Sequence, residues 1–330
     1  MRIGVVGAGA VGGAIAALLS RVGHEVEVTA RGAHLAAIQE HGIILTGAWG
    51  DYRAQVDAAE ELTRGVQLVI IATKAQDAPA AIRDNIAVLR GIPLVVIQNG
   101  LDAMANAKAA SPRSDIVGGL ATFASSYLSP GTITVTAAGP LYLGVTASDS
   151  DVPARYAARI LAEALPTSTV ANFAGAQWTK LIINMVNALP AITGLSVQEV
   201  LKDSGLKRIL TRSMKECVRT ALASHVHFET LQGLTHRRLR WFAAMPLWAA
   251  ASLPALMARR MGATPNPGST LQSIKRGQTT EIDYLNGAVV RAAQAIGRTA
   301  PVNAELVKLV HEVERTKAFL TPAEVARRVG

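Results

Sequence analysis

The sequence predicts an α/β protein in which an N-terminal doubly wound parallel sheet is followed by an all-helical C-terminal domain. Strand-like and helix-like segments alternate through the first half, as in a parallel sheet with crossover helices. From Gly175 onward the remaining pattern is helical. The 330 residues are long for one hydrophobic core, so we expect two domains, 1–172 and 173–330.

The strands of the parallel sheet are expected at short apolar runs bounded by turn residues. These runs are "RIGVVG" (2–7), "EVEVTA" (25–30), "VQLVIIAT" (66–73), "PLVVIQ" (93–98) and "IVGGLATFA" (116–124). Alanine-rich stretches at 10–21, 77–89 and 101–109 predict the helices between them.

The rest of the first domain departs from this rhythm. "SPGTITVTAAGPLYLGV" (129–145) combines turn residues with short alternating strands, so we expect antiparallel hairpin strands that extend the sheet. A helix at 152–164 and a short strand within 167–172 complete the domain.

The composition excludes several classes of protein. Half of the residues are hydrophobic, as in a globular enzyme, and the net charge is +9. The basic residues are scattered and do not interleave with aromatics, which argues against nucleic-acid binding and favours attraction of small anionic ligands. The single cysteine, Cys217, excludes an internal disulfide. The opening strand "MRIGVVG" leaves no room for a cleaved signal, so we expect a cytoplasmic protein.

The apolar stretch "WFAAMPLWAAASLPALMA" (241–258) has the length of a membrane span. Its prolines, Pro246 and Pro254, and its many alanines argue against stable membrane insertion. We expect one or two short helices that form a lid or a subunit contact, which favours a homodimer. Contact with a membrane surface is the alternative.

A glycine motif marks the expected cofactor site. "VVGAGAVGGAIAALL" (5–19) follows a strand and opens an apolar helix, the context that a Rossmann-type dinucleotide-binding fold requires. Gly7 permits a tight turn, Gly9 lets a pyrophosphate approach the backbone, and Gly12 lets the helix approach the sheet. A glycine-rich turn without a ligand is the alternative. The residues between these glycines that we expect at the cofactor are Ala8, Ala10 and Val11.

The ends of three strands carry further candidate cofactor residues. The second strand ends "VTARG", without an acid for a ribose hydroxyl but with Arg31 for a 2′-phosphate, which favours NADP over NAD. Lys74 in "ATKAQD" and Asn99 in "IQNGLD" follow two other strands and are candidates for cofactor or substrate contact. Their alternatives are a solvated loop charge and a simple turn.

A polar stripe interrupts an otherwise apolar helical segment, "WTKLIINMVN" (178–187). At α-helical spacing, Lys180, Asn184 and Asn187 share one face. If this face meets the substrate, Lys180 polarises a carbonyl oxygen and supplies its proton, and the asparagines bind polar parts of the substrate. Alternatively, the lysine extends to solvent and the asparagines join helices.

A second cluster, "STLQSIKRGQTTEIDYLNGAVV" (269–290), bears on this choice. Together with "GAGAVGG", "TKAQD", "QNG", "WTKLIIN" and "TAPVN" (299–303), it makes the sequence resemble the ketopantoate reductase family over nearly its full length. The resemblance implies that Lys180 is the proton donor and that Asn184 binds substrate. It implies that Ser269 binds the substrate carboxylate and that Glu281 lies by the cofactor and the lysine. A carboxylate there keeps a partly buried ammonium charged, although a solvated helix charge is the alternative. The positions that match cofactor contacts of the family are Arg31, Lys74, Asn99 and Ala124.

Three departures from the family pattern concern the substrate side. The family's second asparagine lies eight residues after the lysine, where this chain has Ala188, and Asn187 comes one residue earlier. Ser273 replaces a common acidic residue, and the segment 225–265 is longer and more apolar.

The resemblance implies NADPH-dependent reduction of 2-dehydropantoate to (R)-pantoate, a step of pantothenate biosynthesis. One rival is a related NADP-dependent reductase of another 2-keto acid or of an imine, as in opine formation. The other rival is an NADP(H)-sensing protein without turnover.

Overall fold

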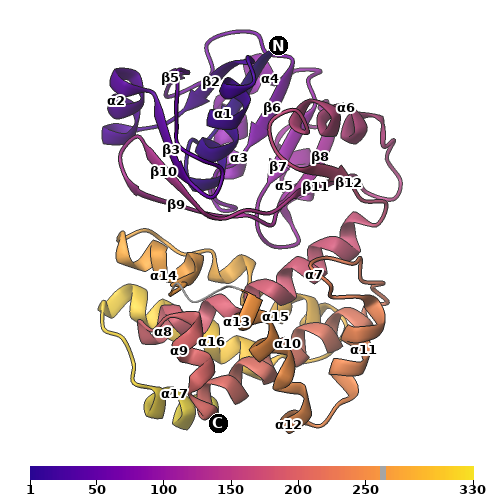
Figure 1. Ribbon diagram of the computed structural model, residues 1–330. Coiled ribbons are helices and arrows are strands. Elements are labelled where there is room, and N and C mark those ends of the chain that lie inside the picture. The colour runs from indigo at the N-terminus through magenta and orange to yellow at the C-terminus, as the bar shows by residue number, and fades with distance from the viewer. Residues whose placement is uncertain (261–264) are drawn as a thin grey trace. The chain divides into compact units, whose positions relative to one another are not determined.

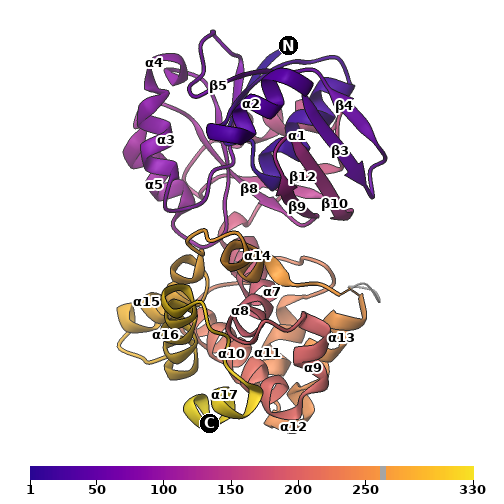
Figure 2. The same ribbon diagram turned by 90° about the vertical axis from the view of Figure 1, so that its left-hand side faces the viewer.

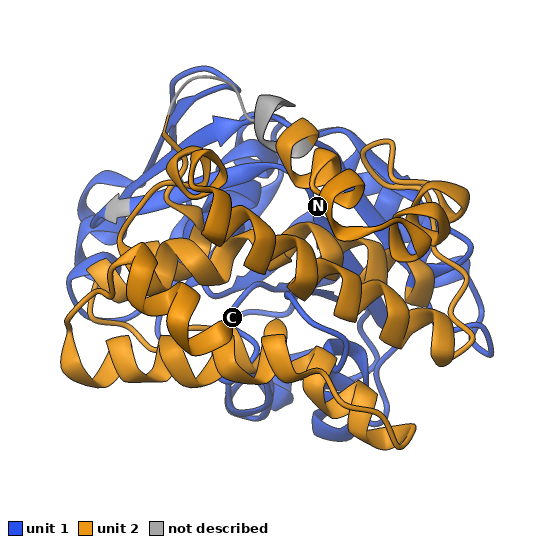
Figure 3. Cartoon of the chain, turned by 90° about the horizontal axis from the view of Figure 1, so that it is seen from below, with its two compact units in different colours: residues 1–173 blue, residues 174–330 orange. Residues whose placement is uncertain are grey.

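The computed structural model describes residues 1–260 and 265–330. Residues 261–264, near the end of the apolar segment 225–265, lie outside the described residues. The chain divides into two compact units, residues 1–173 and 174–330, which Figure 3 colours separately. The sequence placed this boundary between residues 172 and 173.

Unit 1 contains an eight-stranded sheet in the order β12-β11-β8-β7-β6-β1-β2-β5 (Figure 1). The six strands from β8 to β5 are mutually parallel, and β11 runs antiparallel to β8. The central strands are covered on both faces, which explains their continuous apolar sequences. The strands are β1 (Arg2–Val6), β2 (Glu25–Thr29), β5 (Asp57–Ala59), β6 (Leu68–Ile71), β7 (Leu94–Ile97), β8 (Ile116–Ala121), β11 (Leu141–Gly144) and β12 (Thr167–Thr169).

A second sheet of four strands was not predicted (Figure 2). It consists of β4 (Tyr52–Ala54), β3 (Ile43–Gly47), β10 (Thr132–Ala137) and β9 (Ala124–Ser129), in that order. The segment 129–145, expected to form hairpin strands that extend the main sheet, divides between the two sheets. Its strand β10 pairs with β9 and β3 in the second sheet, and β11 pairs antiparallel with β8 in the main sheet. The sheet depends on a parallel pairing between β3 and β10, strands distant in sequence, which local periodicity does not reveal.

Helix α1 (Ala10–Arg21) packs against strands of both sheets. Its residues from Gly12 to Leu19 are all buried, so it needs apolar side chains on every face. The predicted helix 77–89 divides at Asn85, whose side chain binds backbone groups of Leu62 and Ala81. The other helices of unit 1 are α2 (Gly32–His41), α3 (Ala78–Asp84), α4 (Ile86–Leu89), α5 (Ala103–Ala110) and α6 (Val152–Leu161).

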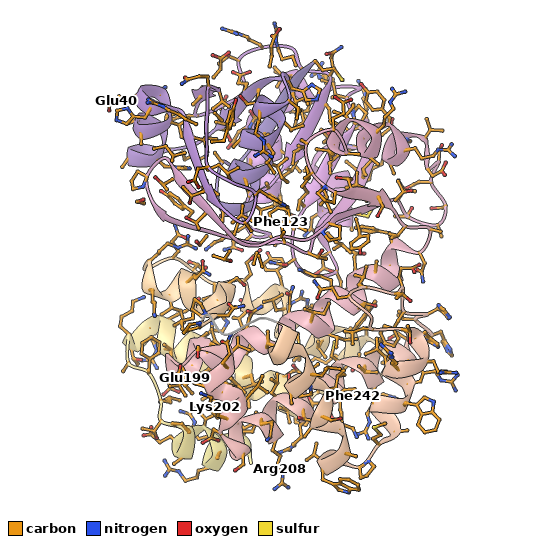
Figure 4. The ribbon with its side chains drawn as sticks, viewed as in Figure 1. Glu40, Phe123, Glu199, Lys202, Arg208 and Phe242 are labelled. Carbon is orange, nitrogen blue, oxygen red and sulfur yellow. The ribbon has the colours of Figure 1, made fainter. Side chains whose placement is uncertain are left out.

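Unit 2 is helical, and its described part contains no β-strand. The 20-residue helix α10 packs against α9, α11, α15, α16 and α17. Helix α9 begins with a capping box in which Ser196 and Glu199, the latter labelled in Figure 4, bind each other's backbone amides. The elements are α7 (Phe173–Asn184), η1 (Met185–Asn187), α8 (Ala188–Thr193), α9 (Val197–Lys202), α10 (Ser204–Ala223), α11 (His236–Ala244), α12 (Leu247–Ala250), α13 (Ser252–Arg260), α14 (Gly268–Lys275), η2 (Ile282–Tyr284), α15 (Asn286–Ala295), α16 (Pro301–Thr316) and α17 (Pro322–Val329).

The stretch 241–258 covers part of α11 together with α12 and most of α13, so it forms three helices where one or two were expected. Two cations of α10 bind carbonyls at the end of α11: Lys215 binds Met245, and Arg219 binds Ala243 at 3.1 Å. The segment is therefore anchored to the central helix of unit 2. Among the described residues, no helix is long and apolar enough to cross a bilayer.

The segment that carries the polar stripe is not one continuous helix. Helix α7 ends at Asn184, and a 3-10 turn over residues 185–187 precedes α8. Pro190 explains the break, because its ring conflicts with the carbonyl of Val186 and it offers no backbone N–H. Lys180 and Asn184 are one turn apart in α7, whereas Asn187 lies in the 3-10 turn, so the expectation of one continuous α-helix through all three residues is wrong. Side chains three residues apart eclipse in a 3-10 turn, so a shared face for Asn184 and Asn187 stays a prediction.

The "TAPVN" segment belongs to a buried polar network at the start of α16. The side chain of Asn303 accepts hydrogen bonds from Ser213 and Asn286, both at 2.8 Å, and donates to Glu216 at 2.8 Å. Glu216 also accepts the backbone N–H groups of Val302 and Asn303. A carboxylate at a helix N-terminus satisfies unpaired amides and the helix dipole, so this network joins α10, α15 and α16.

Candidate functional site

The glycine loop after β1 lies where the strand order reverses, since β1 has β2 on one side and β6 on the other. Gly7 has φ +96°, and an added Cβ would lie 2.8 Å from the Thr73 side chain. At Gly12 a Cβ would lie 2.1 Å from the carbonyl oxygen of Gly7. The turn and the close approach of α1 therefore both require glycine at these positions.

Gly9 differs from its neighbours, because a Cβ there would meet no described atom within 4 Å. Gly9 is the N-cap of α1, and no side chain caps this helix. Thr73 directly precedes Lys74. Its buried hydroxyl has no hydrogen-bond partner among the described residues. Open backbone at a helix N-terminus and an unsatisfied hydroxyl beside Gly7 fit the pyrophosphate of a dinucleotide.

The backbone of the glycine loop is held by the following strand–helix unit. Thr29 at the end of β2 accepts the N–H of Gly7 through its hydroxyl at 2.9 Å and the N–H of Ala8 through its carbonyl at 2.9 Å. The carbonyl of Ala8 is 2.7 Å from Nε2 of His34 in α2. These three hydrogen bonds hold two N–H groups and one carbonyl of a short turn. They therefore restrain the conformation of the turn in the absence of a ligand.

Arg31 is the N-cap residue of α2, at the carboxyl end of β2. Its side chain is 76% exposed, and its guanidinium lies 3.6 Å from the carboxylate of Asp84 at the end of α3. An exposed ion pair of this kind contributes only about 0–1 kcal/mol, so the guanidinium is available to a more highly charged anion.

The other cofactor candidates of unit 1 also follow strands. Lys74 is half-buried after β6, and its carbonyl accepts the N–H groups of Asp77 and Ala78 at the start of α3. Asn99 is half-buried after β7, next to Gln98, which donates to the carbonyl of Thr73 at 3.3 Å. Ala124 is the first residue of β9.

In unit 2, Lys180 lies within α7 and is half-buried. Burial lowers the pKa of its ammonium group to about 8, because the charged form loses hydration. Asn184 follows it by one helical turn and is 8% exposed. An amine with this pKa is mostly charged at neutral pH yet releases its proton readily, which suits a general acid.

Asn187 and Ser269 come together at the start of α14. The side-chain oxygen of Asn187 accepts the backbone N–H of Ser269 at 3.3 Å. Gly268 has φ +71°, and a Cβ on it would lie 2.6 Å from the same oxygen. Asn187 thus docks the first turn of α14 onto η1, while the Ser269 side chain is exposed.

Glu281 lies between two residues tied to α16. The backbone N–H of Thr280 donates to Glu314 at 2.7 Å, and His311 binds Glu314 at 2.7 Å and Asp283 at 3.0 Å. Burial lowers the pKa of His311, but its hydrogen bonds to Glu314 and Asp283 outweigh burial and raise the pKa above 6.5. A protonated His311 donates to both carboxylates, so it fixes the backbone around Glu281.

Four residues that the sequence reading missed have roles around these candidates: Thr29, His34, Thr73 and Asp84. Thr29 and Thr73 stand at strand ends, so the rule that ligands gather at these ends includes them. His34 and Asp84 lie within or at the end of helices, and nothing in the sequence pattern distinguishes them from surface residues.

Comparisons with known proteins identify the family of this chain. Residues 3–148 match the family model described as ketopantoate reductase PanE/ApbA, and residues 172–314 match the model of its C-terminal part. The chain belongs to the ketopantoate reductase family. As a ketopantoate reductase family member, it is an NAD(P)-dependent oxidoreductase.

Curated relatives of this ketopantoate reductase family member match at low identity over nearly the full length. The 2-dehydropantoate 2-reductase of Pyrococcus abyssi is 26% identical over 94% of this chain and 97% of its own. The enzyme of the same name from Mesorhizobium japonicum is 27% identical over 95% and 98%.

Two solved structures have the same fold. The PanE/ApbA family ketopantoate reductase from Ralstonia eutropha JMP134 is 28% identical with a TM-score of 0.80, covering 96% of this chain and 99% of its own. The complex of D-mandelate dehydrogenase with NADH and anilino(oxo)acetate has a TM-score of 0.81 over the same shares at 21% identity. At that identity the likeness shows the fold alone.

Two single-methyl substitutions separate cofactor binding from folding. Gly9→Ala places its Cβ in open space, so we expect a stable protein whose cofactor affinity falls, because the methyl group occupies the approach to the helix N-terminus. Gly12→Ala forces α1 away from the loop, so we expect loss of several kcal/mol of unfolding free energy. Thermal unfolding and titration of NADP⁺ measure both. Normal cofactor affinity in Gly9→Ala would place the pyrophosphate elsewhere.

Proposed function

We propose that this protein reduces 2-dehydropantoate to (R)-pantoate with NADPH, a reaction of pantothenate biosynthesis. The observation that carries the proposal is the half-buried Lys180, with its pKa lowered to about 8 and Asn184 one helical turn away. A binding or sensing protein has no need for an amine tuned toward neutral pH, because such an amine costs free energy to bury.

The reaction adds a hydride to the keto carbon and a proton to its oxygen. The bound nicotinamide supplies the hydride. Lys180 donates a hydrogen bond to the keto oxygen and transfers its proton as negative charge develops there. With a pKa of about 8, about nine-tenths of the amine is protonated at pH 7. Glu281 is proposed to keep this amine oriented and charged.

The substrate carboxylate is proposed to bind at the first turn of α14. The Ser269 hydroxyl and the N-terminal end of this helix provide hydrogen-bond donors for an anion. Asn184 binds the other polar groups of the substrate. Asn187, proposed from the sequence as a further substrate contact, uses its side-chain oxygen to dock α14, so we assign it support of the Ser269 site.

NADP preference is proposed from Arg31, with Gly7–Gly12, Lys74, Asn99 and Ala124 forming the rest of the cofactor site. Arg31 follows β2, at a position where the chain has no acidic residue to bind a ribose hydroxyl. The fold itself does not select NADP, since D-mandelate dehydrogenase shares it and was solved with NADH.

A second candidate is reduction of a different 2-keto acid or of an imine. The buried Ser273 in α14 stands where the family often has an acid, and Ala188 replaces an asparagine. Both changes lie in or next to the elements proposed to hold the substrate. The segment that forms helices α11–α13 is proposed to contribute to a homodimer or to substrate choice.

The test of the proposed function is NADPH oxidation by the purified protein with a panel of 2-keto acids, including 2-dehydropantoate and a bulky aromatic keto acid. We expect the highest kcat/KM for 2-dehydropantoate. A higher value for another keto acid, or for a keto acid with an amine, supports the second candidate. No turnover with any of these substrates, despite binding of NADPH, contradicts the proposed function and favours a sensing protein.

Lys180→Ala removes the proposed acid. We expect a loss of about 10²–10⁴-fold in the single-turnover rate of hydride transfer, with NADPH binding retained. In the parent protein the reduction rate falls as pH rises through about 8, because the ammonium loses its proton, and this limb disappears in the variant. Lys202→Ala, an exposed lysine on α9 labelled in Figure 4, is the charge-matched control. A rate in Lys180→Ala within a few-fold of the parent contradicts the assignment.

Arg31→Ala tests cofactor choice. A charge-assisted contact with the 2′-phosphate contributes about 1.5–3 kcal/mol, so we expect NADPH to bind about one to two decades more weakly and NADH nearly unchanged. Arg64→Ala, which removes another exposed arginine paired with an aspartate in unit 1, is the control. Equal losses for both cofactors would show that Arg31 supports the fold only.

A further inference from the structure

His34 is a buried residue of α2 whose two ring nitrogens both bind backbone. Nε2 lies 2.7 Å from the carbonyl oxygen of Ala8, and the N–H of Gly131 donates to Nδ1 at 3.0 Å. His34 is 8% exposed. Its ring lies against the ring of Tyr127 in β9, with the two ring centroids 4.3 Å apart. Because Nδ1 accepts a hydrogen bond, it carries no proton. The neutral ring therefore has its proton on Nε2 and donates it to Ala8.

The hydrogen bond to Ala8 has a geometric consequence for the next residue. In a trans peptide unit, the carbonyl of one residue and the N–H of the following residue point in opposite directions. The carbonyl of Ala8 is directed at His34, so the N–H of Gly9 is directed away from His34. Gly9 is the residue at which a Cβ would find open space, at the start of α1.

We propose that His34 is a positioning residue for the cofactor, which, in its neutral form, aims the N–H of Gly9 at the pyrophosphate. The inference rests on the proposed cofactor site at Gly7–Gly12 and deepens it. Without the hydrogen bond from Nε2, the orientation of the peptide between Ala8 and Gly9 is less restrained, because the remaining bonds hold the Ala8 N–H and the Gly9 carbonyl on either side of it. Its N–H is then no longer set in advance for an anion, and cofactor binding has to supply the ordering.

Protonation of the His34 ring disrupts its two hydrogen bonds to the backbone. A proton on Nδ1 would face the N–H of Gly131, so the ring has to move and the link to Ala8 is lost. Burial lowers the pKa of His34, and the hydrogen bond to Ala8 raises it by less, so the net pKa lies below 6.5. Since the folded pKa is depressed, this contribution is fully present above about pH 6.5 and is lost as pH falls through the lower, folded value.

The groups facing the ring explain why burial prevails. The glycine loop, the described buried residues of α1 and the turn at Pro130–Gly131 carry no ionisable side chain, and β9 contributes Tyr127. On α2 itself, the charged and titratable side chains Arg31, Glu40 and His41 are exposed, and Glu40 is labelled in Figure 4. Among the residues that the structure describes, no carboxylate is paired with His34.

Two near-isosteric substitutions separate the two hydrogen bonds. His34→Gln places an amide N–H near the position of Nε2 and keeps the bond to Ala8. His34→Asn places an oxygen near Nδ1, so it keeps the bond from Gly131 and loses the bond to Ala8. The experiment measures the Kd for NAD⁺ and NADP⁺ by calorimetry for the parent and both variants, together with thermal unfolding. NAD⁺ is included because it has no 2′-phosphate that titrates near pH 6.

We expect His34→Asn to bind NAD⁺ about 2–10-fold more weakly than the parent, the effect of one hydrogen bond, and His34→Gln to bind within about twofold of the parent. In the parent, NAD⁺ affinity falls as pH is lowered below 6.5 through the folded pKa of His34, and in His34→Gln it does not. Equal affinities of the two variants, or the same pH dependence in His34→Gln as in the parent, would overturn the proposal.

Two further measurements keep these outcomes distinct. If a variant does not fold, the pH dependence of NAD⁺ binding to the parent decides, and an affinity that stays constant while His34 takes up its proton, as followed by NMR, overturns the proposal. If Gly9→Ala binds cofactor like the parent, the cofactor site itself is wrong. Weak binding by Gly9→Ala with equal binding by the His34 variants shows instead that only the role of His34 fails.

Discussion

The close approach of α1 to the end of β1 is the constraint on which unit 1 depends. With only 2.1 Å between a would-be Cβ on Gly12 and the carbonyl of Gly7, a single methyl group is enough to separate helix and strand. The same helix is the shared layer between the two sheets, so its position sets the packing of both. It also sets where the first backbone amides of α1 point, which links the packing of the core to the binding of an anion.

Much of unit 1 follows from local sequence. The glycine motif, the apolar strands and the full extent of α1 are predicted because each has a short-range signal in period or composition. The four-stranded sheet is not, since it joins residues 43–54 to residues 124–137 by pairings with no local signature. The role proposed for His34 is not predicted from the sequence, for the same reason. Its importance comes from two backbone atoms, at Ala8 and Gly131, that only the fold brings to it.

The polar residues of unit 2 divide into two groups that sequence alone does not separate. Asn303 and Asn286 are fully buried and satisfy other polar groups, so they hold helices together. Lys180 is half-buried and Ser269 is exposed, which is the environment of residues that meet a ligand. Residues of both groups lie in sequence motifs that resemble those of the family, so the motifs do not separate the two groups. Burial and hydrogen bonding are the basis on which we propose which residues support the fold and which meet a ligand. The hydrogen bond that the Asn187 oxygen accepts from Ser269 is the reason that we place Asn187 in the supporting group.

The 3-10 turn that separates α7 from α8 makes the two halves of the proposed chemistry separately adjustable. Lys180 belongs to α7, which precedes the turn. Asn187, the last residue of the turn, docks α14, the helix that carries Ser269. We therefore expect substitutions within α14 to leave the register of the lysine in α7 unchanged. Under the proposed function, a lineage with this arrangement can diversify the acids it accepts while inheriting the proton-transfer step intact, and Ala188 and Ser273 lie on the side of the turn that such changes would affect.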